Sequence, residues 1–445
     1  ARTKDNIQSN QRMNMIRIYL KQAWETARQN RLFSSIYVVG TGLSIALTMT
    51  LFIIFYVKTA PIYPEYNRDR TLVVRYVKSY PPDKPENWSA GLVSPTLAEL
   101  ADSLPHVDDV AVTMSSSIRG QYVALPGQKQ TFNIFLLYVN ADFWRVFPFR
   151  FLSGKPLTEA DVEARTPTAV ISESLARRLF ASTDVAGKTF HYRGRPYTVS
   201  GVVQDVSSAT PDVVADVWMP LSLDAASSYD DPAFGLLGNL TCFLLVDDAD
   251  NKEAVKESLR EAVRRHDAGR ERVNDLMGQP DDAALSTFRT NPANAPDTDG
   301  LFRSLLYIVL ALLFIPAVNL SGMIASRMDR RTGELGIRKA YGATRATLLG
   351  QVLWENLLLT LAGAVAGLVF CYVIVLTSGS WILTLFDTAV NTSLPTPFLT
   401  MEMLFNPWVF LCTFALCLVL NVVSALLPAW WGLRHTIVEE LYTKR

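Results

Sequence analysis

Long apolar runs on either side of a long polar insert dominate the pattern of the chain. The run Tyr37–Val57 holds 21 residues without a charge, about the length needed to cross a hydrocarbon core of roughly 30 Å as a helix. Three more runs follow, at Leu305–Ile324, Val352–Thr377 and Trp408–Leu427. The pattern predicts four transmembrane helices. A cleaved signal peptide is the alternative for the first run, although 21 apolar residues exceed the roughly 7 to 15 of a signal-peptide core.

The positions of Lys and Arg in the short flanking segments predict the orientation, because such residues collect on the cytoplasmic side. Residues 1–34 carry seven of them and the loop Ser326–Thr347 carries six, whereas the loop Ser378–Pro407 carries none. Both termini are therefore expected in the cytoplasm, and the insert Lys58–Gly300 is expected outside.

Composition agrees with a membrane protein that also has a folded domain. The chain is 49% hydrophobic and 19% charged, with 42 Lys+Arg against 42 Asp+Glu. The apolar content excludes a disordered chain, and zero net charge excludes a globally basic nucleic-acid binder. The net charge of zero is the sum of +10 on the three cytoplasmic segments, −8 on the insert and −2 on the remaining segments, which supports the orientation.

The expected fold class is a membrane protein of four transmembrane α-helices, with a large α+β extracytoplasmic domain inserted between helices 1 and 2. The expected segments are a cytoplasmic N-terminal segment with an interfacial amphipathic helix (1–34), transmembrane helix 1 (35–57), the α+β core domain (58–300), transmembrane helix 2 (301–325), a cytoplasmic loop (326–347), transmembrane helix 3 (348–377), a short outer loop (378–407), transmembrane helix 4 (408–429) and a cytoplasmic tail (430–445).

Helix and strand signals alternate within the insert. Ser94 and Pro95 open a capped helix, and branched and aromatic residues indicate strands at Thr131–Asn140 and Thr241–Val246. The other expected elements are a short helix at Ser172–Phe180, a hairpin at Phe190–Val203, a longer helix at Lys252–His266 and a polar connection at Asn291–Gly300.

Candidate chemistry is sparse. The segment Ser182–Thr189 (STDVAGKT) ends like a phosphate-binding loop, but Ser182 occupies the position of the required glycine and a hairpin is expected where that motif has a helix. The four histidines lie singly, so no metal-ligand spacing exists. Only Cys242 of the four cysteines lies in the insert, which excludes a disulfide framework there. We expect no catalytic, cofactor or metal site on this chain.

The loop after the second run has helical spacing. Glu334 and Arg338 are four residues apart on a helix, and Gly342 is expected to end the turn. Spacing alone leaves two interpretations open: a solvated loop retained inside by its charge, or a docking helix for a partner.

Two further features suggest helix contacts. Met15–Phe33 has the pattern of an interfacial helix lying on membrane lipid, and a solvated helix packed on its own chain is the alternative. Gly363 and Gly367, and likewise Gly40 and Ser44, are spaced for close helix packing. Whether either pair serves dimerisation stays open on spacing alone.

Two regions carry a family resemblance. Gly333–Leu359 (GELGIRKAYGATRATLLGQVLWENLLL), together with Val139–Leu157, Thr168–Phe180 and Val185–Val206 of the insert, resembles the MacB/FtsX-type ABC transporter permeases, whose layout of one span, a large outer domain and three spans is similar over essentially the whole chain. In that family the GKT-like residues belong to a structural hairpin.

The resemblance implies a noncatalytic permease of the bacterial inner membrane, with a periplasmic core domain, that works as a dimer with a second permease copy or a paralogue. It implies a separate pair of ABC ATPase subunits that bind the ATP and Mg, and mechanotransmission from those subunits to the periplasmic domain. The implied ATPase-coupling interface is Arg330, Arg331, Glu334, Leu335, Gly336, Ile337, Arg338, Lys339 and Gly342.

Efflux of periplasmic substrates, with a periplasmic adaptor and an outer-membrane duct as possible partners, is the favoured function. Two alternatives remain. One is a lipoprotein-releasing or lipid-handling permease, and the other is an FtsX-like signalling scaffold that controls a cell-wall hydrolase.

Overall fold

The computed structural model describes residues 25, 28, 31–115, 121–207, 209–330, 337, 340–342, 344–384 and 407–432. The chain divides into two compact units. The helical unit comprises Ala1–Phe55, Asp299–Ser378 and Leu404–Arg445, and the outer domain comprises Tyr56–Thr298 and Gly379–Met403. The expected interfacial helix at Met15–Phe33 lies largely outside the described residues.

All four apolar runs are helical. The helices are α2 (Arg31–Thr59), α9 (Thr298–Arg330), α11 (Arg345–Thr384) and α13 (Pro407–Gly432). Among the described residues, Ser34–Thr59 and Asn356–Thr377 are long and apolar enough to cross a membrane, and Phe410–Val419 is a shorter apolar stretch. Crossing by α9 and α13 stays a prediction.

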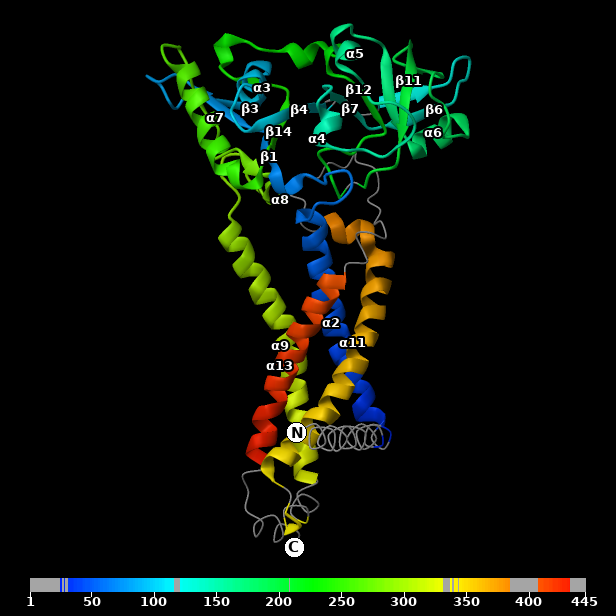
Figure 1. The fold of residues 1–445 in the computed structure, drawn as a ribbon, viewed down its shortest axis with the longest axis vertical. Coiled ribbons are helices and arrows are strands. Elements are labelled where there is room, and N and C mark those ends of the chain that lie inside the picture. Colours follow the sequence, from blue (N-terminus) through cyan, green and yellow to red (C-terminus); the bar gives the residue numbers. More distant parts are fainter. Residues whose placement is uncertain are drawn as a thin grey trace, which may run out of the picture. The chain divides into compact units, whose positions relative to one another are not determined.

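Glycines bring α2 and α11 into close contact, and the two helices run side by side in Figure 1. A Cβ on Gly42 would lie 3.1 Å from the carbonyl oxygen of Gly363, and one on Gly367 would lie 2.8 Å from that of Gly42. Small residues permit such approach where lipid removes the hydrophobic drive for helix association. Gly363 and Gly367 thus pack within the chain, against Gly42 and its neighbours.

Hydrogen bonds above and below the glycines set the direction of this helix pair. Tyr37 Oη and Thr360 Oγ1 are 2.8 Å apart, and Thr50 Oγ1 and Cys371 Sγ are 3.5 Å apart. Because both residue numbers rise together along the contact, α2 and α11 are parallel.

A small apolar core joins all four helices. Ile45, Val309, Ala364 and Cys417 form one buried cluster, with one residue from each helix. Phe302 near the start of α9 packs edge-on against Phe55 near the end of α2, with ring centroids 6.0 Å apart. These contacts agree with α9 running antiparallel to α2.

A mixed sheet organises the outer domain. Twelve strands follow the order β16-β1-β14-β4-β7-β12-β9-β11-β10-β5-β6, with β8 paired to β11, and a second sheet has the order β13-β3-β2-β15. The strands are β1 (Thr71–Val74), β2 (Val77–Tyr80), β3 (Ser89–Val93), β4 (Val107–Ser115), β5 (Gln121–Ala124), β6 (Thr131–Ile134), β7 (Leu136–Val139), β8 (Phe151–Gly154), β9 (Thr168–Ser172), β10 (Thr189–Tyr192), β11 (Arg195–Val203), β12 (Val217–Pro220), β13 (Leu237–Gly238), β14 (Thr241–Val246), β15 (Val273–Asp275) and β16 (Asp281–Asp282).

Helices cover this domain at several places. Figure 1 shows α3 and α7 together at one end of the domain and α6 beside β11 at the other. The α-helices are α3 (Pro95–Asp102), α4 (Phe143–Val146), α5 (Glu159–Glu163), α6 (Glu173–Phe180), α7 (Lys252–Asp267) and α8 (Ala283–Ser286), and the 3-10 helices are η1 (Arg68–Arg70), η2 (Leu221–Leu223), η3 (Ala225–Ser228), η4 (Pro232–Phe234) and η5 (Ala249–Asn251).

The central strands are buried on both faces. Along β1, Leu72 and Val74 belong to one apolar core, whereas Val73 between them belongs to another. Strand side chains point alternately to opposite faces, so the two cores lie on opposite sides of the sheet. The second core is rich in aromatic rings, such as Trp144 and Trp218, whose centroids are 6.3 Å apart. A run of apolar residues without alternation is the expected signature of such strands.

Most elements expected in the insert are present. Ser94 accepts a hydrogen bond from the Leu97 amide at the start of α3, and the expected hairpin is formed by β10 and β11. The single strand expected at Thr131–Asn140 is wrong, because the chain changes partners at Phe135. Before that residue β6 pairs with β5, and after it β7 pairs with β4 and β12. The Phe135 amide donates instead to Asp216.

Close packing at Gly367 makes a testable prediction. Gly367→Ala forces a methyl group against the α2 backbone and Ile45, 2.9 Å away, and overpacking of this kind costs about 1–3 kcal/mol. Gly350→Ala in the same helix is the matched control, since no described atom lies within 4 Å of its added Cβ. We expect only Gly367→Ala to lower the melting temperature of the full chain in detergent. Equal melting temperatures for the two variants would contradict this packing.

Burial of Cys242 makes a second prediction. Its side chain is 1% exposed in β14, and burial raises the pKa of its thiol to about 12. Since the thiolate is the reactive form, we expect Cys242 to resist iodoacetamide at pH 8 until the domain unfolds. Ser228→Cys, at an exposed position, is the control that should react at once. Peptide mass spectrometry resolves the two sites, and rapid labelling of Cys242 in the folded chain would refute the prediction.

Candidate functional site

The predicted coupling loop is described in part. Arg330 is the last residue of α9, while Arg331, Glu334, Leu335, Gly336, Arg338 and Lys339 lie outside the described residues. Ile337 is helical, and its carbonyl accepts from the Tyr341 amide at 3.1 Å. Gly342 follows with φ +91°, a conformation that glycine adopts without strain. The predicted turn at Gly342 is therefore present.

Two apolar side chains beside this turn face solvent among the described residues. Ile337 is 54% exposed and Tyr341 is 89% exposed. They are four residues apart, so on a helical turn they lie on the same side. Exposed large apolar groups that lie together commonly mark a contact surface. Tyr341 was not among the residues singled out from the sequence, and its position one helical turn after Ile337 was the available signal.

The GKT-like segment is part of a hairpin. The Gly187 amide donates to the Val199 carbonyl at 2.8 Å, and the Lys188 amide donates to the Val185 carbonyl at 3.0 Å. A phosphate-binding loop instead directs such amides outward to the ligand. Thr189 begins strand β10 rather than a helix, and Lys188 Nζ lies over the Phe180 ring, 5.5 Å from its centroid.

A buried ion pair lies where α2 ends. Arg68 Nε donates to Glu65 Oε2 at 2.7 Å, and its side chain is only 4% exposed. Arg68 Nη1 donates to the carbonyls of Val57 and Ala60, at 3.1 and 3.0 Å. The last carbonyls of a helix have no partner within the helix. Arg68 supplies that partner and attaches the last turn of α2 to η1.

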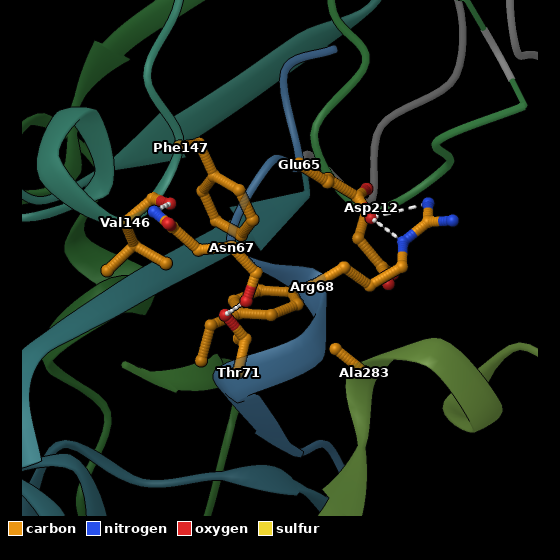
Figure 2. Close-up of a pocket in the computed structure, with 9 residues that line it drawn as sticks. Glu65, Asn67, Arg68, Thr71, Val146, Phe147, Asp212 and Ala283 are labelled. Carbon is orange, nitrogen blue, oxygen red and sulfur yellow. Dashed lines mark hydrogen bonds and ion pairs between the residues drawn. The ribbon is translucent and has the colours of Figure 1, made fainter. Parts of the chain in front are cut away.

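Figure 2 shows the hollow beside this pair, with the Arg68 guanidinium turned toward Glu65 and Asp212. The remaining lining residues are Asn67, Thr71, Val146, Phe147, Phe243 and Ala283. Its enclosed part has room for about one water molecule. The hollow is therefore a gap in the packing around the ion pair and not a pocket for a substrate.

Burial dominates the electrostatics of Glu65. Burial raises the pKa of its carboxyl, and the charge of Arg68 opposes this rise. Asp212 is paired elsewhere, because Arg75 Nη2 donates to it at 2.8 Å. The sequence did not single out Glu65 or Arg68. Their spacing of three residues soon after an apolar run is compatible with an ion pair, but the same spacing is equally typical of a solvated turn.

No group of three or more metal-ligating side chains occurs in the part of the chain that the structure describes. His106 Nδ1 lies 2.9 Å from Asp247, and both side chains are somewhat less than half exposed. His266 Nδ1 lies 3.3 Å from Asp267 in a buried setting, where the Asp267 carboxylate also accepts from Asn274. These two histidines therefore make local contacts within the domain.

The fold defines the general class of the protein: a helical membrane unit with an α+β domain inserted after its first helix. A family model for the MacB-like periplasmic core domain matches residues 34–262, and one for the FtsX-like permease C-terminal region matches residues 306–437. The chain belongs to the MacB-like, FtsX-like family of ABC transporter permeases. Members of this family are inner-membrane proteins with a periplasmic domain.

Individual relatives are distant. The uncharacterized ABC transporter permease YknZ of Bacillus subtilis is 25% identical over 52% of this chain and 54% of its own length. The pyoverdine export ATP-binding/permease protein PvdT of Pseudomonas aeruginosa is 23% identical over 78% of this chain and 50% of its own. The chain thus spans about half the length of the curated relatives it matches. The crystal structure of the periplasmic region of MacB from Actinobacillus actinomycetemcomitans is 18% identical, covering 45% of this chain and 88% of its own, with a TM-score of 0.32.

The Arg68 ion pair makes a stability prediction. Arg68→Met leaves the Glu65 carboxyl buried without its partner, and such a loss costs about 3–5 kcal/mol, on the order of 10 °C in the melting temperature of a domain this size. Because burial raises the pKa of Glu65, folding disfavours its ionised form. The loss of folding stability in Arg68→Met should therefore grow as the pH rises above 4.5, the ordinary pKa of a Glu carboxyl.

The matched control is Arg177→Met. Arg177 pairs with Glu173 at 2.8 Å, but its side chain is 62% exposed, and exposed pairs contribute about 0–1 kcal/mol. Thermal unfolding of both variants, followed by circular dichroism between pH 5 and 8, separates them. An Arg68→Met variant as stable as Arg177→Met at every pH would show that the buried pair has no such role.

Proposed function

We propose that this chain is the permease subunit of a MacB-like ABC transporter, which couples ATP hydrolysis by a separate ATPase subunit to movement of its periplasmic domain. The observation that carries the proposal is the presence of both family regions, in order, on one chain. Relatives named as export ATP-binding/permease proteins support efflux as the transport reaction. On this proposal ATP and Mg bind to the ATPase subunits, and this chain is noncatalytic.

The proposed arrangement has four spans, α2, α9, α11 and α13, with both termini in the cytoplasm. The Lys and Arg residues of segments 1–34 and 326–347 support this orientation. The parallel contact between α2 and α11 also supports it, since helices 1 and 3 of an alternating bundle point the same way. The complex further contains a second permease copy or paralogue and, for efflux, a periplasmic adaptor and an outer-membrane duct.

The loop between α9 and α11 is the proposed docking site for the ATPase. Its basic residues and the exposed side chains of Ile337 and Tyr341 offer charge and apolar surface together. The full proposed interface is Arg330, Arg331, Glu334, Leu335, Gly336, Ile337, Arg338, Lys339 and Gly342.

Reversing charge within this loop tests the docking site. The double variant Glu334→Arg/Arg338→Glu should release the ATPase subunit or uncouple its hydrolysis, because charges that complement the partner would be inverted, while the permease stays folded and inserted. Copurification of the ATPase and its hydrolysis rate in nanodiscs are the measurements.

Glu173→Arg/Arg177→Glu is the matched control, since this pair has the same spacing on the exposed face of α6. It should leave both measurements unchanged. If the loop variant retained the ATPase and its activity as well as this control does, 326–347 would not be the coupling site.

Capture of a periplasmic partner tests the transport class. Crosslinking in the native membrane, followed by mass spectrometry of the purified chain, should identify a periplasmic adaptor. Recovery of a lipoprotein or a cell-wall hydrolase in its place would replace efflux by one of the two alternative functions.

A further inference from the structure

One end of the large sheet of the outer domain is covered on only one face. The path of strands ends in the order β11, β10, β5 and β6, and Figure 1 shows β6 and β11 at the end of the domain away from α3 and α7. Side chains along a strand point alternately to opposite faces. On one face they belong to the apolar core, as Val123, Ile134, Phe190, Tyr192, Tyr197 and Val199 do. The other face is open to solvent, and Tyr122 on it is 53% exposed.

The two hairpins at this end carry only positive charge. Segments 121–134 and 185–203 contain no Asp or Glu, and their charged residues are Lys129, Lys188, Arg193 and Arg195. All four side chains are exposed. Among the residues that the structure describes, none of the four has a carboxylate within ion-pair distance. We call these two segments the basic edge, and their charge contrasts with the net −8 of the whole insert.

Local structure does not account for this charge. Arg193 (φ +50°) and Gly194 (φ +75°) form the turn between β10 and β11, and Asn or Gly is usual in such a turn because both residues have positive φ. The Arg193 guanidinium carbon lies 5.3 Å from the centroid of the Tyr192 ring. By contrast, Arg178 in the neighbouring helix α6 is paired with Asp216 at 2.9 Å. The basic edge therefore offers its positive charge to a partner.

Strand β6 is a free edge in the part of the chain that the structure describes. It pairs with β5 on one side, and the order of strands ends there. A free edge presents amide and carbonyl groups that have no partner within the sheet. Thr131 and Asn133 of β6 are exposed, while Phe132 between them is only partly buried against the core. A further strand beside β6 would pair with its backbone and cover Phe132.

We propose that β6 is a docking edge for an extended acidic segment of a partner protein, which joins the sheet as a further strand. In strand addition, main-chain hydrogen bonds supply the affinity and side chains supply the specificity. Because side chains alternate, the segment presents apolar residues on the side of Phe132 and acidic residues on the open face, which the four cations border. The proposal does not depend on the transport reaction proposed above.

Charge complementarity selects this occupant. A lysine beside a free edge deters unwanted strand pairing, and the basic edge repels a second copy of itself in the same way. The same charges attract an acidic strand, so they reject one partner and favour another.

A single phosphate group fits the basic edge less well. The pairing of the strands places Lys129 and Lys188 at one end and Arg193 and Arg195 at the other. A strand of four residues such as β6 spans about 13 Å between these ends. Charges separated in this way match carboxylates distributed along a strand.

Binding of designed peptides to the full chain in phosphatidylcholine nanodiscs tests the docking edge. The probe is a short labelled peptide in which valine and glutamate alternate. One matched peptide has lysine in place of glutamate. A second keeps the glutamates but has N-methylated backbone amides, which removes the hydrogen bonds that they donate without changing the charge. Fluorescence anisotropy gives the dissociation constants, and hydrogen exchange followed by mass spectrometry reports protection of the amides of 131–134.

The valine–glutamate peptide should bind, protect the amides of 131–134 and lose affinity as salt is added. The lysine peptide and the N-methylated peptide should each bind at least about tenfold more weakly. Lys129→Glu/Arg193→Glu should weaken the valine–glutamate peptide about tenfold, because two attractions become repulsions. Lys84→Glu/Arg270→Glu, at two exposed cations outside the basic edge, is the matched control and should bind like the parent.

Three results would overturn the proposal. Equal affinity for the N-methylated and unmodified peptides would exclude strand addition, and equal affinity of the two double variants would exclude the basic edge as the site. Phosphatidylglycerol vesicles that displace the peptide, with the same loss of binding in Lys129→Glu/Arg193→Glu, would show a lipid site instead of a protein site. If that variant fails to fold, the three peptides on the parent chain still decide. None of these results bears on the proposed transport function.

Discussion

The constraint on which the outer domain depends is that two buried positive charges must be neutralised beside the connections to the helical unit. Burying an unpaired charge is costly, so Arg68 and Arg289 specify where Glu65 and Asp281 lie and which backbone carbonyls face them. The strand pair β1 and β16 places these groups at one edge of the sheet. The chain therefore enters and leaves the domain through a polar, water-excluded setting.

Different forces stabilise each of the two units. In the outer domain, apolar side chains cover both faces of a mixed sheet, and the loss of their contact with water supplies the stabilisation. In the helical unit, packing of small residues replaces that force. Gly42 and Gly367 let two backbones touch, while the Tyr37–Thr360 hydrogen bond fixes the register of the two helices.

Sequence reasoning succeeded where a signal is local. The cap at Ser94, the strand Thr241–Val246 and the turn at Gly342 each depend on a few adjacent residues, and each is present. It failed at Phe135, where one apolar run is divided between two different strand pairings. Strand propensity does not reveal which partner a residue finds, because that partner comes from a distant part of the chain. Gly42, which lies between Gly40 and Ser44, packs closely against α11, and close packing at Gly40 and Ser44 themselves stays a prediction.

By itself the sequence determined that this is a membrane protein with a large inserted domain. The lengths of the apolar runs and the distribution of Lys and Arg indicate this, because both depend directly on how residues interact with lipid and water. It also located the loop proposed to couple to an ATPase. Only the tertiary structure decided which charges become buried and paired. Glu65 and Arg68 would pass for a solvated turn in the sequence, and Asp281 and Arg289 are eight residues apart in a polar stretch. Both ion pairs form only on folding, which removes the four side chains from water and places backbone carbonyls beside the two guanidinium groups.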